Sequence, residues 1–492
     1  MDAPTDRDPV SAQGVHGQHS MVATGHPAAA RAAHAMLQSG GSAVDAAIAA
    51  DAILGVVEPM ATGIGGDVLA MLVEPDGTAI TYNGTGRAPR AWRDELLAAL
   101  PQQKIPERHA LTLTTPGAVR GWFDLHARYG RLPFAQLLQP AIAMARAGFA
   151  VAPIAAREWA LFAPVLHGDA VSARLYRAEQ PPQAGERFSN PELATVLEDI
   201  ACGGADAFYR GRPAQAAQQA SERHGGILTA QDFAEHTGFF APPLRAEFRG
   251  LTVLACPPNT HGMAVLEALR ELEPQTLLRD EPRTVLCTVQ AMRRAMRRAR
   301  EEVADPAGTV CTAIIDQDGL GISLMSSVFK RFGSGISADG CGFVLQNRGF
   351  GFGRPGTRNA PGAAKRPYHT VVPGGTLRDG RLHACFGVVG GAMQPQGQVQ
   401  ILERLAAFGQ GLQEALDAPR WRLESDTALA IEAGTPPEVT ALLRASGFVD
   451  PVGEGELGGR SDFGGAQFAM RLADGSLLGA SDKRKDGMAL GG

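Results

Sequence analysis

The sequence predicts an α+β fold, because helical and strand-like segments fall in different parts of the chain. From about residue 117 to residue 304 helical patterns dominate, whereas strand-like pieces alternate with two or three helices after residue 309. Two dipeptides, Asp76-Gly77 and Asp318-Gly319, each lie between two apolar runs and are typical of hairpin turns. With 492 residues the chain can bury a large core.

The first elements should be two helices and a hairpin. Residues 26–41 predict a helix that ends at a glycine pair, and residues 42–59 predict a second helix. Ser42 is the expected N-cap of the second helix, and Asp45 stands where a capping box has its acid. This helix is apolar nearly all round, so it should be buried. The hairpin is expected over residues 67–84.

The later elements follow from the same two periodicities. Helices are expected in the middle of the chain over residues 117–130, 134–148, 191–201, 262–273 and 283–305. Strands are expected after them over residues 311–316, 321–327, 369–375, 383–391, 428–433 and 466–472. Helices over residues 397–408, 411–419 and 437–447 lie between these strands.

Charge and cysteine usage exclude several classes of protein. The formal net charge of −5 gives no reason to expect a nucleic-acid partner. Residues 1–20 are polar and contain no apolar stretch, so we expect a flexible tail and no signal peptide. No apolar run approaches the length of a membrane span. The six cysteines form no CxxC pair, which favours a reduced, cytoplasmic protein.

Two motifs resemble binding sites but have simpler explanations. The segment TGIGGD (62–67) follows a helix and precedes a strand, the reverse of the order in a dinucleotide site, so we expect a tight turn. The segment RRAMRRAR (293–300) is basic, but one such helix in an acidic protein is typical of a solvated face. We therefore expect neither a cofactor nor a metal.

A Gly-Thr pair, Gly308-Thr309, precedes the first strand after the long helical region. This arrangement is that of a precursor that cuts its own chain: the threonine hydroxyl attacks the preceding carbonyl, and the resulting ester is hydrolysed. Gly308 suits the cut, because a residue without Cβ tolerates strained backbone geometry. The cut frees the α-amine of Thr309, whose ordinary pKa of roughly 7.7–8.0 makes it a usable base at neutral pH. On its own the pair is a weak signal.

Five ordered blocks make the chain resemble the gamma-glutamyltransferase family, of the N-terminal-nucleophile hydrolase superfamily. The resemblance runs from about residue 21 to residue 485 and is closest to the leaderless branch with LQNRG and RPYHT. The blocks begin with MVATGHPAAARAAHAMLQSGGSAVDAAIAADAILGVVEPMATGIGGD and LTLTTPGAVRGWFDLHARYG. They continue with TVCTAIIDQDGLGISLMSSVFKRFGSG, KRPYHTVVPGG and FGVVGGAMQPQGQVQ.

The resemblance implies the architecture and the maturation. The fold should be a four-layer αββα sandwich in which a large and a small chain intertwine in one domain. Residues 21–308 should form the large chain, and residues 309–492 the small chain that carries the nucleophile at its N-terminus. The two chains should stay associated as a heterodimer, and further dimerisation is left open.

The resemblance also carries catalytic roles over to particular residues. Thr309 falls on the nucleophile. Ser327 falls where the family has a threonine hydroxyl near the nucleophile, and it could assist the self-cleavage. Gly390 and Gly391 fall on the glycine pair whose backbone N–H groups form the oxyanion hole. Such donors are typically worth roughly 10²–10³-fold in rate.

The substrate pocket departs from the family's pattern for reading an amino acid. Thr85 replaces the arginine that grips the α-carboxylate of glutamate. Phe329 and Gly351 replace the asparagine and the acid that hold the α-amino group. His369 and Thr370 replace the serine pair of the substrate loop. The side chains with which the family binds the α-carboxylate and the α-amino group of an amino-acid substrate are therefore mostly missing.

These departures predict an N-terminal threonine amidohydrolase or acyltransferase that acts on a small-molecule amide through an acyl-threonine ester. The acyl group should be small and acidic, of the oxamate or glutaryl type. The expected substrate-binding residues are Arg87, Phe329, Arg348, Tyr368, His369 and Thr370. Two alternatives stay open. One is a gamma-glutamyl hydrolase or transferase acting on glutathione-like substrates, and the other is an uncleaved, non-catalytic homologue acting as a binding protein.

Overall fold

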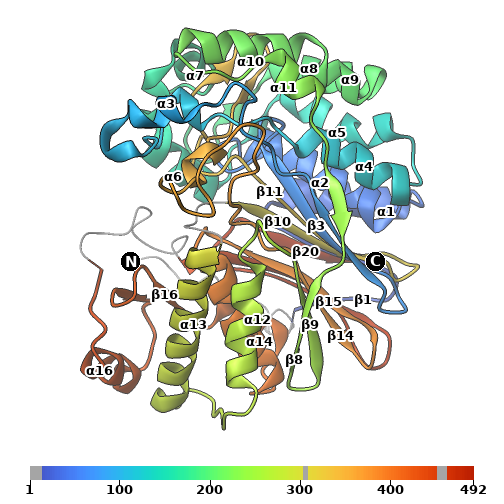
Figure 1. The fold of residues 1–492 in the computed structure, drawn as a ribbon. Coiled ribbons are helices and arrows are strands. Elements are labelled where there is room, and N and C mark those ends of the chain that lie inside the picture. Colours follow the sequence, from blue (N-terminus) through green and yellow to red (C-terminus); the bar gives the residue numbers. More distant parts are fainter. Residues whose placement is uncertain (1–13, 303–308, 452–462) are drawn as a thin grey trace.

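Two seven-stranded antiparallel sheets pack face to face in the computed structural model, which describes residues 14–302, 309–451 and 463–492 (Figure 1). Helices cover the outer face of each sheet. Four layers have three interfaces, and the buried apolar residues separate into a cluster between the sheets and one cluster under each helical layer. The predicted four-layer αββα sandwich is therefore confirmed.

The first sheet has the strand order β20-β2-β10-β11-β3-β4-β7. Its centre is the hairpin of β10 and β11, which pairs Val310 with Ser326. The Asp318-Gly319 turn joins these two strands, as expected. The strands of this sheet are β2 (Met21–Thr24), β3 (Asp67–Val73), β4 (Ala79–Asn83), β7 (Phe239–Ala241), β10 (Val310–Ile315), β11 (Gly321–Ser327) and β20 (Met488–Gly491).

The second sheet has the strand order β1-β19-β18-β15-β14-β9-β8. Strands β15 and β18 lie across β10, so the centres of the two sheets face each other. The strands of this sheet are β1 (Val15–Gly17), β8 (Leu244–Phe248), β9 (Leu251–Ala255), β14 (Gly374–Arg378), β15 (Arg381–Val389), β18 (Gly465–Arg471) and β19 (Leu477–Ser481).

The outer layers consist of helices from different parts of the chain. Those over the first sheet include α1 (Pro27–Gln38), α2 (Ala43–Val57), α4 (Ala118–Tyr129), α5 (Phe134–Ala147), α8 (Pro191–Gly203) and α10 (Arg212–Arg223). Those over the second sheet are α12 (Gly262–Leu272), α13 (Pro282–Glu302), α14 (Met393–Ala406) and α15 (Leu412–Asp417), with α16 (Pro437–Ala445) packed on α13. Helix α2 is buried along its whole length and begins with the predicted capping box of Ser42 and Asp45.

Both sheets combine strands from before and after residue 309. In the first sheet β10 lies between β2 and β11, and β11 lies between β10 and β3. In the second sheet β14 pairs with β9. Each half of the chain therefore completes sheets begun by the other half, which is the intertwined single domain predicted from the sequence.

Three local expectations change. We expected a flexible tail through residue 20, but Val15–Gly17 forms the edge strand β1, and residues 1–13 lie outside the described residues. The hairpin of β8 and β9 interrupts the helical region, where no strand was expected. Residues 369–373 precede β14 instead of belonging to it.

The two ambiguous motifs have structural roles. At the TGIGGD turn, a Cβ on Gly65 or Gly66 would lie 2.0 Å from the carbonyl oxygen of Val344 or 2.4 Å from that of Ser327, so only glycine fits. Four arginines of α13 pair with acidic side chains: Arg294, Arg297, Arg298 and Arg300. Among the described residues, no helix has both the length and the apolar character needed to cross a bilayer.

Candidate active site

Thr309 stands directly before the central strand β10 and is 1% exposed. Gly308, and with it the bond predicted to be cut, lies outside the described residues. The Oγ1 atom of Thr309 accepts a hydrogen bond of 2.7 Å from Nε2 of Gln394. Gln394 belongs to the first turn of α14, so the fold joins the start of a central strand to the start of a helix 85 residues later.

The amide of Gln394 can have only one orientation. Its Oε1 accepts a hydrogen bond of 3.0 Å from the backbone N–H of Val372, a group that can only donate. The NH₂ group must therefore face Thr309, and Gln394 is a donor to the threonine hydroxyl. Sequence reasoning missed this residue. A signal was present, because the buried helix α14 carries glutamine at every second position: Gln394, Gln396, Gln398 and Gln400.

Ser327 ends β11, next to the strand that Thr309 precedes. Because Val310 pairs with Ser326, the register places Thr309 and Ser327 at the same end of two neighbouring strands. The Oγ of Ser327 accepts hydrogen bonds from the backbone N–H of Phe329 at 2.8 Å and from Nη2 of Arg348 at 3.1 Å. Both acceptor positions of the hydroxyl are thus used. Towards any further partner the Ser327 hydroxyl can therefore act only as a donor, so it is unsuited to take up a proton as a base.

Gly390 and Gly391 connect β15 to α14, with φ angles of +110° and +61°. A Cβ on Gly390 would lie 2.9 Å from Cα of Gly464, so this position requires glycine. The amide groups of the pair find no hydrogen-bond acceptor among the described residues. The carbonyl of Gly391 accepts from the backbone N–H of Gln394 at 3.1 Å, which ties the pair to the residue that holds Thr309. Two free N–H groups near a hydroxyl fit an oxyanion hole.

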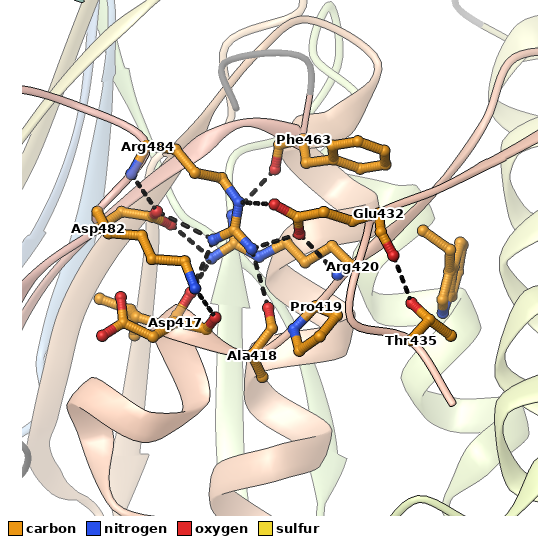
Figure 2. Close-up of polar contacts among 12 residues, drawn as sticks. Asp417, Ala418, Pro419, Arg420, Glu432, Thr435, Phe463, Asp482 and Arg484 are labelled. Atoms are coloured by element: carbon orange, nitrogen blue, oxygen red, sulfur yellow. Dashed lines mark hydrogen bonds and ion pairs between the residues drawn. The ribbon is translucent and has the colours of Figure 1, made fainter. Parts of the chain in front are cut away.

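A buried charge network holds the segment packed against Gly390. Figure 2 shows Asp482 between the guanidinium groups of Arg420 and Arg484. Arg420 donates to the carbonyl of Phe463 at 3.0 Å, and Asp482 accepts from the backbone N–H of Ala466 at 3.0 Å. The two contacts fix the backbone on both sides of Gly464. The network therefore holds in place the segment that packs against Gly390.

Arg348 is fully buried beside Ser327. Besides Ser327, it donates from Nη1 to Oγ1 of Thr370 at 3.4 Å, and its guanidinium lies 4.1 Å from the ring centroid of Phe329. Phe329 has a φ of +79°, a conformation that a phenylalanine rarely adopts and that often marks a functional site. Burial lowers the pKa of Arg348 to about 9, so it is still charged at neutral pH.

Asp67 lies next to Arg348, and His369 lies next to Asp67. Nδ1 of His369 accepts from the N–H of Val371 at 3.2 Å, so the ring proton is on Nε2, which lies 3.5 Å from Oδ2 of Asp67. Burial, together with the charge of Arg348, lowers the pKa of His369 to about 4, and the ring is neutral at pH 7. Burial acts to raise the pKa of Asp67, but the nearby N–H of His369 and the charge of Arg348 outweigh this effect, so the pKa of Asp67 is below its usual range. Asp67 is thus a charged acid beside the buried arginine.

Not all predicted substrate residues meet at this point. Phe329, His369 and Thr370 lie in the contacts around Arg348, whereas the hydroxyl of Tyr368 hydrogen-bonds the ring of His261. Arg87 donates from Nη1 to the carbonyl of Ala364 at 3.3 Å. In the described part of the chain, no contact joins Arg87 to Thr309 or Arg348. The structure thus places the two candidate cations in different surroundings.

Comparisons with known proteins agree with this geometry. A family model described as gamma-glutamyltranspeptidase matches residues 29–308 and 305–492. The glutathione hydrolase-like YwrD proenzyme of Bacillus subtilis is 30% identical, with 97% of this chain and 99% of that protein aligned. The oxamate amidohydrolase proenzyme of Klebsiella pneumoniae is 31% identical, with 96% and 98% aligned.

Solved structures show the same architecture. The crystal structure of cephalosporin acylase from Bacillus halodurans superimposes with a TM-score of 0.93 and 31% sequence identity. The superposition covers 100% of this chain and 99% of that chain. The likeness therefore includes both halves of the fold and every element that carries the candidate site.

Proposed function

This chain belongs to the gamma-glutamyltranspeptidase family, and we propose that it is a self-processing amidohydrolase with Thr309 as its nucleophile. The names of its relatives support this class of reaction: one is an oxamate amidohydrolase and others are acylases, and the curated relatives of this kind are proenzymes. The contact of Gln394 with the Thr309 hydroxyl supports the choice of nucleophile, because Gln394 links this hydroxyl to the glycine pair through its own backbone N–H.

The proposed maturation cuts the chain between Gly308 and Thr309. The Thr309 oxygen adds to the Gly308 carbonyl carbon, the C–N bond breaks, and the nitrogen takes up the hydroxyl proton. Water then hydrolyses the ester, which leaves a carboxylate on Gly308 and a free α-amine on Thr309. The products are residues 1–308 and 309–492. They should stay together, because strands of one half pair with strands of the other half in each sheet.

In turnover the new α-amine of Thr309 takes the hydroxyl proton while the oxygen attacks the substrate carbonyl. The tetrahedral oxyanion would be held by the N–H groups of Gly390 and Gly391. The leaving amine takes the proton from the α-ammonium as the C–N bond breaks. Water hydrolyses the acyl-Thr309 ester by the same steps. Throughout, the donor amide of Gln394 would hold the nucleophilic oxygen and favour its negative charge.

We propose a small, acidic acyl group, and the observation that carries this choice is the buried guanidinium of Arg348. Burying a charged group is costly unless it is paired. Among the described residues, the hydrogen bonds of Arg348 go to two hydroxyl groups, and its guanidinium lies over an aromatic ring. Its one acidic neighbour, Asp67, lies 3.9 Å from Nε. An acyl carboxylate could form a paired, charge-assisted hydrogen bond with this guanidinium.

A gamma-glutamyl hydrolase is the second candidate, and Asp67 is the observation that favours it. Its Oδ2 has no hydrogen-bond partner in the described residues and could accept from an α-ammonium group. Its Oδ1, in contrast, already accepts from the backbone N–H groups of Gly86 and Gly117 and from Gln346. The neutral His369 also presents its N–H towards Oδ2, which leaves little room for an ammonium.

Two anilides that differ in one group separate the candidates. Glutaryl-p-nitroanilide and gamma-glutamyl-p-nitroanilide differ only by the α-ammonium group. We expect the processed enzyme to release nitroaniline faster from the glutaryl compound. Because each unpaired polar contact costs roughly 1–3 kcal/mol, the ratio of kcat/KM should be about tenfold or more. A higher kcat/KM for the gamma-glutamyl compound would establish the second candidate instead.

A further inference from the structure

A cavity of about 300 Å³ lies outside the contacts of Thr309 and Arg348. This volume is at the lower end of the range for small-molecule sites. The walls come from both halves of the chain: the large-chain part supplies most of the lining, and Ala364 belongs to the small-chain part. The polar and charged groups that matter for its chemistry are Arg87, Thr115, Asp232, Glu235 and His236.

Two arginines line this cavity: Arg90, which is paired with Glu235, and Arg87, whose backbone is held firmly. Its carbonyl accepts from the N–H of Thr115 at 3.1 Å, and the next residue, Ala88, donates to the carbonyl of Lys365 at 2.8 Å. Only Nη1 of the side chain has a hydrogen bond, to Ala364. Within the described ranges Arg87 forms no ion pair. Its remaining N–H groups are thus available to an occupant of the cavity.

The acids of the cavity already have partners. Oδ1 of Asp232 accepts from the backbone N–H of Arg90 at 2.9 Å, and its Oδ2 caps a helix through Thr229. Glu235 forms an ion pair with the side chain of Arg90. The oxygens of Asp232 already accept from neutral donors and Glu235 pairs with Arg90, so in the described residues neither acid forms an ion pair with Arg87. The guanidinium of Arg87 is therefore open to an anionic ligand.

His236 gives a second, independent indication of a ligand. It is 3% exposed, and both of its ring nitrogens are buried without a hydrogen-bond partner among the described residues. Tyr209 stacks on the ring and fixes its plane. Burial lowers the pKa of His236 to about 3, so the ring is neutral and presents one N–H donor and one acceptor. Buried polar groups normally have partners, and an oxygen atom in the cavity would supply one.

We propose that this cavity binds a small organic carboxylate, with one carboxylate oxygen on the guanidinium of Arg87 and hydrogen bonding to the imidazole of His236. The volume admits an acid of the size of malonate or glutarate. The site is separate from the acyl site at Arg348 and does not depend on Thr309 being the nucleophile. Because Ala364 and Lys365 lead to His369 and Thr370, an occupant would contact the segment that carries the residues around Arg348.

Calorimetric titration with sodium malonate and sodium glutarate at constant ionic strength tests the proposal. The protein would carry Arg348→Met, which removes the cation of the proposed acyl site and changes no residue that lines the cavity. We expect saturable binding at one site per molecule. Adding Arg87→Gln should weaken binding by at least about tenfold, because a charged hydrogen bond is lost. Adding His236→Phe should weaken it as well, while Arg245→Gln, a change at an exposed arginine on β8, should have no effect.

Either of two results would overturn the site: no saturable binding to the Arg348→Met protein, or equal affinity with and without Arg87. If the Arg348→Met protein does not fold, the wild-type protein is compared with the single variant Arg87→Gln. The variant should then bind one carboxylate fewer per molecule than the wild type. No turnover is measured in this experiment. A failure of the cavity is thus distinguishable from a failure of the proposed amidohydrolase.

Discussion

The side-chain amide of Gln394 donates to the hydroxyl of Thr309 at 2.7 Å, and its orientation is set by the backbone N–H of Val372. A fixed donor at this position stabilises negative charge on the oxygen and leaves its proton to another acceptor. The free α-amine of a processed Thr309 would be that acceptor. In the proposed mechanism, two groups would thus have separate roles: Gln394 would hold the oxygen, and the amine would take the proton.

Gln394→Leu should lower kcat per processed molecule by roughly 10- to 100-fold, which corresponds to the loss of one hydrogen bond to a developing charge. Gln396→Leu is the matched control. Gln396 is equally buried and also bonds backbone groups, at Ala392 and Leu423, but it does not contact Thr309. Both variants should lose similar stability. Equal loss of kcat in the two would remove Gln394 from the mechanism.

Self-cleavage should depend on the hydroxyl of Thr309. Wild-type protein should separate into two fragments in denaturing gels, and the smaller should begin Thr-Val-Cys-Thr. Thr309→Ala should remain full length, whereas Thr309→Ser keeps a hydroxyl and should still be cut. Intact-mass measurement distinguishes these products. An active wild-type protein that stays whole would disprove both the cut and the nucleophile, and an inactive whole protein would favour the binding-protein alternative.

Most helices and strands could be predicted from the sequence because their signals are local, whereas their arrangement in four layers was predicted from the family resemblance. The Asp-Gly turns, the capping box of Ser42 and the periodicity of the strands each depend on a few neighbouring residues. The hairpin of β8 and β9 was missed because its strands are short and lie among long helices. Local signals of this kind say which segments form elements, but not which elements meet.

The site was harder to predict because it depends on distant contacts. The sequence offered Arg87 and Arg348 as equal candidates for a substrate carboxylate, and only the folded chain places Arg348 on Ser327 and Arg87 on Ala364. Gln394 is 85 residues from Thr309, and no periodicity reveals that its amide meets the hydroxyl. Its role follows only from the approach of α14 to β10.

Arg348→Met should raise KM for glutaryl-p-nitroanilide by about tenfold or more, because the acyl carboxylate loses its charged donor. Arg87→Met should raise it less, since Arg87 does not contact the residues around Ser327 in the described structure. Both variants should still cut themselves. Initial rates over a range of substrate concentrations provide the comparison, and a larger effect at Arg87 would reverse the assignment of the two cations.

Glu403 should make stability depend on pH. Burial raises its pKa to about 7 in the folded protein, against an ordinary value of 4.5, although a hydrogen bond from Thr288 acts in the opposite direction. Folding therefore favours the protonated form. The stability that this group contributes is fully present below pH 4.5 and is lost as pH rises through 7.

Glu403→Gln keeps an acceptor for Thr288 and removes the charge. The melting temperature of the variant should match that of the wild type near pH 4.5 and exceed it above pH 7. The shift in pKa corresponds to at most about 3 kcal/mol. Melting curves at several pH values between 4.5 and 8 measure the difference, and a constant difference across this range would rule out a raised pKa.

Two aspartates, each paired with two arginines, allow a test of the network behind Gly390. Asp482 is buried between Arg420 and Arg484, whereas Asp426 lies 43% exposed between Arg297 and Arg300. Asp482→Asn leaves the buried guanidinium of Arg420 without its acidic partner, while Arg484 keeps Glu432, and the change should cost roughly 3–5 kcal/mol. Asp426→Asn should cost less than about 1 kcal/mol, because water screens the pair.

The same two variants should differ in catalysis. Asp482→Asn weakens the hold on Phe463 and Ala466, the residues around the glycine that contacts Gly390, so kcat should fall while KM changes little. Asp426 has no such connection, and kcat should be unchanged in Asp426→Asn. Denaturation and steady-state rates on folded, processed protein give the two measurements. Lost stability with an unchanged kcat would show that the network supports the fold but does not position the oxyanion hole.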